Sequence, residues 1–74
     1  MNDDFRWNYN LLGRLKMDCE YFLGHGNRNT KHLWGITVKD HIAEMYKQYD
    51  IVPEKPEWLT LEEIQEYEQQ MILT

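Results

Sequence analysis

The sequence predicts a small all-α domain of three helices, on three observations. Three stretches repeat apolar residues at steps of three and four, which is the spacing of one helix face. Residues suited to cap a helix precede the second and third stretches. The chain of 74 residues allows one domain at most, residues 1–74, and its 14% aromatic content can supply a core at that size.

The first helix is predicted over residues 8–23. Its apolar stripe consists of Leu12, Leu15, Cys19 and Phe22, with Leu11 at its edge. Gly24 and Gly26 are expected to end this helix by adopting positive φ. Gly13, inside the pattern, costs about 1 kcal/mol relative to alanine. It indicates either the close approach of another element or a helix that starts later.

The second helix is predicted over residues 38–49. An irregular connector over residues 32–36 precedes it and is expected to bring Trp34 into the core. Thr37 fits an N-cap whose hydroxyl accepts a hydrogen bond from the backbone N–H of Asp40. Pro53 prevents a much longer helix. The inward residues are Val38, His41 or Ile42, Met45 and Tyr49, with Tyr46 on the edge.

The third helix is predicted over residues 61–71, after an extended linker that contains two prolines. The linker is expected to pack on the body through Ile51 and Val52. Thr60 and Glu63 form a capping box at the start of the helix. Leu59 is expected to pack on Ile64, and the inward residues are Leu61, Ile64, Met71 and either Tyr67 or Glu68.

The three tryptophans, Trp7, Trp34 and Trp58, are the largest side chains available for so small a core. At least two of them are therefore expected to be buried. An exposed tryptophan would mark a site for a partner, because exposed aromatic side chains are concentrated at binding surfaces.

The net charge of −5 is unevenly distributed. Residues 1–49 carry seven Lys or Arg and six Asp or Glu, for +1, whereas residues 50–74 carry one and seven, for −6. This balance disfavours non-specific binding to nucleic acid or anionic lipid. No apolar run is long enough to cross a bilayer, and the acidic start of the chain does not resemble a signal peptide. With a single cysteine, these features predict a cytoplasmic setting.

No residue set predicts catalysis or a cofactor. Cys19, His25, His32 and His41 are the only soft or borderline metal ligands, and at least five residues separate each from the next, unlike the pairs of structural zinc sites. Cys19 lies on the core stripe and is read as a structural cysteine, and the histidines as surface or capping residues. The chain is therefore expected to be no enzyme, with no metal, no cofactor and no small-molecule substrate.

Two regions are candidates for binding. The first is the polar loop of residues 24–32, which contributes His25, Asn27, Arg28, Lys31 and His32. It can also be read as a tight turn whose Asn side chains bond their own backbone. The second is the acidic side of the third helix, Glu62, Glu63 and Glu66, which could imitate a row of phosphates or be a solvated helix face.

Two blocks carry a family resemblance: residues 10–28, which include Leu-Lys-Met-Asp-Cys-Glu-Tyr and Gly-His-Gly-Asn-Arg, and residues 31–34, Lys-His-Leu-Trp. With residues 53–60, they make the chain resemble the large polyvalent protein-associated domains, number eleven of that series, over about residues 8–71. The resemblance implies a small module of bacterial mobile elements and phages, either alone or attached to very large proteins. It implies no catalytic residue, and favours interaction, including interference with host defence.

The sequence thus predicts a non-enzymatic accessory module that binds a partner protein, as an orthogonal three-helix unit, through the loop, the acidic last helix or both. One alternative is a small inhibitor of a host defence nuclease, anti-CRISPR-like, that uses its carboxylates as a nucleic-acid mimic. Another is a nucleic-acid-binding helical domain that uses Arg14, Arg28, Lys31 and Lys39. The proline linker and the acidic last helix argue against that alternative, because a helix-turn-helix needs a tight turn and a recognition helix that phosphate does not repel.

Overall fold

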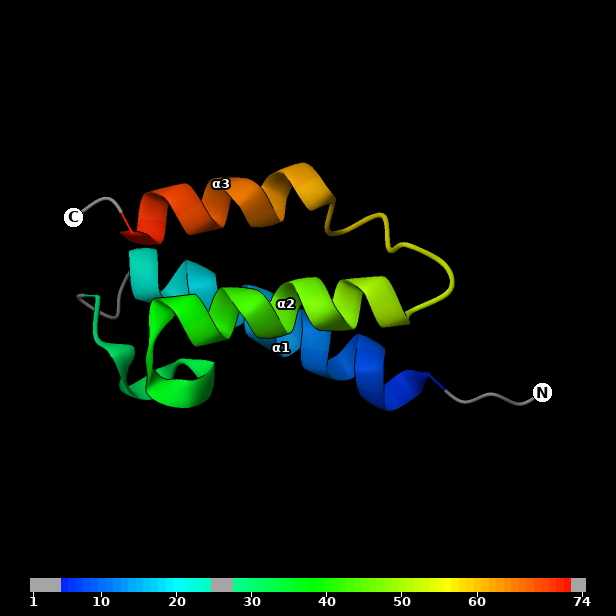
Figure 1. The fold of residues 1–74 in the computed structure, drawn as a ribbon, viewed down its shortest axis with the longest axis horizontal. Helices are drawn as coiled ribbons and strands as arrows, with labels where there is room; N and C mark the ends of the chain where they lie inside the picture. The colour runs from blue at the N-terminus through cyan, green and yellow to red at the C-terminus, as the bar shows by residue number, and fades with distance from the viewer. Residues whose placement is uncertain (1–4, 25–27, 73–74) are drawn as a thin grey trace.

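The computed structural model describes residues 5–24 and 28–72 of the chain. They form α1 (Arg6–Leu23), two short 3-10 turns η1 (Thr30–His32) and η2 (Trp34–Ile36), α2 (Val38–Ile51) and α3 (Leu61–Ile72), with no strand among them. The predicted all-α class and the three helices are confirmed. Figure 1 shows the helices side by side and running in alternating directions, with α1 behind α2, rather than crossing orthogonally as expected.

α1 buries the predicted stripe of Leu12, Leu15, Cys19 and Phe22. It begins at Arg6, so a later start does not explain Gly13. Another element does approach at this point, because a Cβ at Gly13 would lie 3.8 Å from Cη2 of the Trp58 ring, but this is an ordinary contact that does not require a glycine. The backbone N–H of Gly24 donates to the carbonyls of Glu20 and Tyr21 and ends the helix with a φ of −100°. The expected positive φ is therefore wrong for Gly24, and Gly26 lies outside the described residues.

The helix starts predicted from capping residues are confirmed. The Thr37 hydroxyl accepts from the Asp40 N–H at 3.0 Å. At α3, the Glu63 N–H donates to the Thr60 hydroxyl at 3.1 Å and the Glu63 carboxylate accepts from the Thr60 N–H at 2.9 Å. α2 continues beyond Tyr49 to Ile51, because Val52 can still donate its N–H to the Gln48 carbonyl before Pro53.

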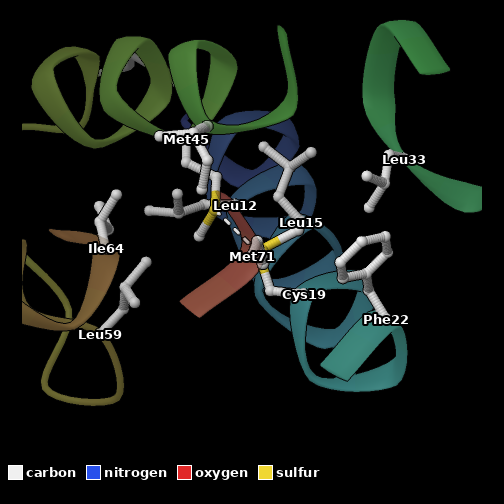
Figure 2. Packing of buried hydrophobic residues seen from close by; sticks show 10 residues of the cluster. Leu12, Leu15, Cys19, Phe22, Leu33, Met45, Leu59, Ile64 and Met71 are labelled. Carbon is white, nitrogen blue, oxygen red and sulfur yellow. Dashed lines mark hydrogen bonds between the residues drawn. The ribbon is translucent and has the colours of Figure 1, made fainter. Parts of the chain in front are cut away.

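The core contains aliphatic and sulfur-bearing side chains and one phenylalanine (Figure 2). Leu59 lies beside Ile64, as predicted, and Leu33 reaches the core from the connector. The inward residues of α2 include His41, which is buried rather than a surface or capping histidine, and Gln48. Leu61 and Ile51, both predicted to face inward, are exposed, whereas Val52 is buried.

The tryptophans are not part of this core. Trp7, Trp34 and Trp58 are 64%, 44% and 45% exposed, so the expectation that at least two would be buried is wrong. At the connector, the backbone N–H of Trp34 donates to the ring of buried His41, and the neighbouring Leu33 takes the interior position instead. The three largest side chains of the protein therefore remain at its surface.

Candidate protein-binding surface

The side of α1 turned away from the core carries Trp7, Arg14 and Tyr21 at intervals of seven residues. Seven residues are close to two helical turns, so these side chains stand in one line along the helix. Met17, which is 68% exposed, stands beside that line. α1 therefore presents a ridge of mixed aromatic, apolar and cationic character to solvent.

On one side of this ridge, α1 and the connector enclose a hollow of about 420 Å³. Buried Leu15 and Leu33 form its floor, and Trp34 lies opposite α1. The full lining is Trp7, Leu11, Arg14, Leu15, Asp18, His32, Leu33 and Trp34. A smaller hollow of about 200 Å³, lined by Trp7, Asn10, Leu11 and Arg14, adjoins it.

On the other side of the ridge, α1 and the linker before α3 enclose a hollow of about 630 Å³. It is lined by Tyr9, Asn10, Gly13, Arg14, Met17, Asp18 and Trp58. Gly13 leaves the backbone of α1 bare at this point, and the edge of the Trp58 ring lies against it. Arg14 and Asp18 line both large hollows.

We call this surface the tryptophan face, defined by the six residues Trp7, Arg14, Met17, Asp18, Trp34 and Trp58. It combines exposed aromatic rings, a methionine and an arginine with the concave apolar surface of the hollows. Tryptophan, arginine and methionine are enriched at the centres of protein interfaces, where tryptophan and arginine carry much of the binding energy. The chemistry available here is therefore recognition by apolar contact and charge.

His41 fixes one wall of the tryptophan face. Its Nδ1 accepts from the Trp34 N–H at 2.8 Å, so its Nε2 carries the proton and donates to the Leu15 carbonyl at 2.9 Å. Burial lowers the pKa of His41, against smaller opposing effects of the Leu15 carbonyl and the Asp18 carboxylate. The neutral ring thus ties the connector to α1 and positions Trp34.

Tyr9 fixes the other wall. Its hydroxyl donates to the Glu54 carbonyl at 2.6 Å and accepts from the Glu54 N–H at 3.2 Å. Lys55 adds contacts at the end of α2, where its ammonium donates to the Val52 carbonyl at 2.9 Å and lies 5.0 Å from the Tyr49 ring centre. These bonds hold the linker, and with it the segment that carries Trp58.

The residues of the predicted loop site do not form one surface among the residues that the structure describes. His25 and Asn27 lie outside the described residues. Arg28 has a φ of 58° and its guanidinium donates to the carbonyls of Gln70 and Met71, at 2.8 and 2.9 Å, at the end of α3. Lys31 is exposed, and His32 meets the Tyr21 ring edge-on at 5.4 Å and lines the smaller of the two large hollows.

Arg28 therefore has a structural role, since a cation beside the last carbonyls of a helix satisfies acceptors that the helix itself leaves open. The sequence could not show this, because Arg28 and Gln70 are 42 residues apart. Of the predicted loop residues that the structure describes, only His32 lines one of the hollows beside the tryptophan face.

The predicted acidic site is also partly engaged within the protein. Glu63 caps α3 through Thr60, and Glu68 accepts from the Tyr46 hydroxyl at 3.1 Å. Glu62 and Glu66 are exposed on α3 and line neither large hollow. Of the three carboxylates predicted for this site, Glu62 and Glu66 therefore face solvent, whereas Glu63 belongs to the cap.

The Cys19 thiol is buried and is not activated as a nucleophile. Burial raises the pKa of Cys19 to about 12, and its Sγ lies 3.4 Å from Sδ of Met45. Within residues 5–24 and 28–72, no three His, Cys, Asp or Glu side chains gather as a metal site would require. None of the helices formed by the described residues is both long and apolar enough to span a membrane.

Of the tryptophan face, sequence reasoning named Arg14 as a possible nucleic-acid contact and the tryptophans as a partner site only if exposed, and it missed Met17, Asp18 and the place where these residues come together. The signal for part of it was present: Arg14 and Met17 fall on the side of the predicted helix 8–23 that its apolar stripe leaves outside, whereas Trp7 precedes that helix. Trp34 and Trp58 gave no such signal, because they lie in irregular segments without periodicity.

Comparison with known proteins gives one match. The family model for large polyvalent protein-associated domain 11 matches residues 5–71. Neither a search of curated proteins nor a search of solved structures found a match. The family match covers α1, the connector, α2, the linker and α3 up to Met71, so the chain belongs to this family.

Proposed function

We propose that this member of the large polyvalent protein-associated domain 11 family is a non-enzymatic module that binds a partner protein through its tryptophan face. The observation that carries the proposal is the exposure of all three tryptophans around the α1 ridge. The partner-binding role expected from the sequence is kept, and its location is moved from the 24–32 loop and α3 to α1.

The energetics support this location. Each buried tryptophan side chain can remove about 150–250 Å² from water, and apolar burial contributes about 25 cal/mol per Å². A chain this small gains stability from every aromatic ring it buries, yet these rings are 44–64% exposed. Exposed apolar surface concentrated on one side of a small domain is typical of an interaction site.

A partner-binding experiment with matched variants tests the proposal. Partners captured by the tagged protein from its host are identified by mass spectrometry, purified, and their affinity is measured for each variant. Met17→Lys and Trp7→Ala should weaken binding at least tenfold, because they remove exposed apolar area from the face. Gln65→Lys, on the exposed side of α3, should leave the affinity unchanged and serves as the control.

The same partner distinguishes acidic mimicry. Glu62→Gln with Glu66→Gln removes the two solvent-facing carboxylates without disturbing the Thr60–Glu63 cap. If this double variant loses the partner while Met17→Lys retains it, the α1 proposal is wrong and mimicry by α3 takes its place.

A further inference from the structure

We propose that the tryptophan face binds a second copy of itself, so that two domains pair through antiparallel α1 helices around a two-fold axis. This inference rests on the proposed function and names its partner. A two-fold interface uses the same patch on both subunits, so the patch must carry both members of every complementary feature. The tryptophan face meets that requirement in charge and in shape.

The charge argument comes from Arg14 and Asp18, which are one helical turn apart. Lys16 and Glu20 have the same spacing on the same helix and close an ion pair at 2.7 Å. Among the described residues, neither Arg14 nor Asp18 makes a side-chain hydrogen bond or ion pair. A two-fold axis between them would set each Arg14 opposite the Asp18 of the other copy, forming two ion pairs by one operation.

The shape argument comes from the ridge and its hollows. α1 stands between hollows of about 420 and 630 Å³, and Arg14 and Asp18 line both. In an antiparallel pair, the ridge of each copy occupies the larger hollow of the other, between Met17 and Trp58. A face with a ridge but no hollow, or a hollow but no ridge, could not pair with itself in this way.

The exposed tryptophan area is large enough for the apolar centre of a dimer interface. The exposed fractions of the three tryptophans correspond to roughly 200–400 Å² of ring surface. A standard interface buries about 800 Å² on each partner, with an apolar centre and a polar rim. The tryptophans supply such a centre, and Asn10, Arg14 and Asp18 supply polar groups around it.

Charge reversal tests the pairing, with sedimentation equilibrium on the purified chain as the measurement. The wild type should pass from monomer to dimer as its concentration rises. Arg14→Asp would place carboxylates opposite one another, and Asp18→Arg would do the same with guanidinium groups, so each should raise the dissociation constant at least tenfold. An equimolar mixture of the two variants restores both opposite-charge pairs and should form a mixed dimer.

Gln65→Lys is the matched control and should dimerise like the wild type, and circular dichroism confirms that each variant is helical. A wild type that stays monomeric at high micromolar concentration overturns the inference. So does a mixture of the two charge variants that stays monomeric while the wild type dimerises. Monomeric wild type that still loses a captured partner through Met17→Lys would refute self-pairing alone and leave the proposed function standing.

Discussion

Acidification should destabilise the protein through His41. The buried ring is neutral, with Nδ1 accepting from the Trp34 N–H and Nε2 donating to the Leu15 carbonyl. Protonation would put a second N–H against the Trp34 donor and a charge into the core. Burial therefore lowers the pKa of His41 in the folded protein below its ordinary value of 6.5. Because the unfolded chain takes up the proton first, the contribution of neutral His41 to stability is fully present above about pH 6.5. It is lost progressively as the pH falls below that value.

The size of this loss follows from linkage. With an unfolded imidazole pKa of about 6.5, a ring that stays neutral in the folded protein can cost at most about 1.4 kcal/mol of the free energy of unfolding between about pH 7.5 and 5.5. In a domain of this length each kcal/mol moves the unfolding temperature by about 4–8 °C, so the expected drop is at most about 6–11 °C. Thermal unfolding followed by circular dichroism at both pH values measures it.

His41→Gln isolates the contribution of this one side chain. The glutamine amide can still donate to the Leu15 carbonyl but does not titrate. The variant should be less stable than the wild type at neutral pH, yet lose less of its remaining stability on acidification. Equal acid sensitivity of both proteins would refute the reasoning, because the proton would then be taken up elsewhere.

Three further substitutions or modifications test other features. Gly35→Ala should lower the free energy of unfolding by about 2 kcal/mol in urea titration, because Gly35 has a φ of 67° and a Cβ there would lie 2.6 Å from Cβ of Asp40; an unchanged midpoint would contradict this. Gly13→Ala should raise it by up to about 1 kcal/mol, since the added Cβ meets Trp58 at an ordinary 3.8 Å; a destabilised variant would show that the Trp58 ring cannot accept that contact. Cys19, whose thiol pKa is raised to about 12 by burial, should react with a thiol reagent only as fast as the protein unfolds; rapid native-state labelling would exclude the buried position.

The parts of the fold that depend on neighbours in sequence could be predicted. The Thr37–Asp40 cap and the Thr60–Glu63 capping box join residues three apart, and both fix helix starts that the structure confirms. The stripe of α1 likewise follows from periodicity alone. These signals are local, so they survive whatever the rest of the chain does.

The parts that depend on distant contacts could not be predicted. Whether Leu33 or Trp34 enters the core is decided by His41, whose ring accepts the Trp34 N–H and thereby sets the direction of the connector. The Arg28 side chain, predicted as part of the loop site, instead donates to carbonyls 42 and 43 residues away at the end of α3. Neither contact has a signature in composition or spacing. Both are reasons why we propose the binding surface on α1 and not in the loop.

Unfavourable backbone conformations and exposed apolar side chains occur together in the connector that carries Trp34. Gly35 and Ile36 follow it with φ values of 67° and 65°, and the second is a β-branched residue that is 63% exposed. A left-handed conformation costs an ordinary residue about 1–2 kcal/mol, and an exposed Trp34 forgoes burial as well. Among the described contacts, the capture of the Trp34 N–H by His41 and the burial of Leu33 offset part of that cost. Burial of Trp34 against the proposed partner would offset more of that cost. Departures of this kind from local sequence preference are expected at functional or strained sites.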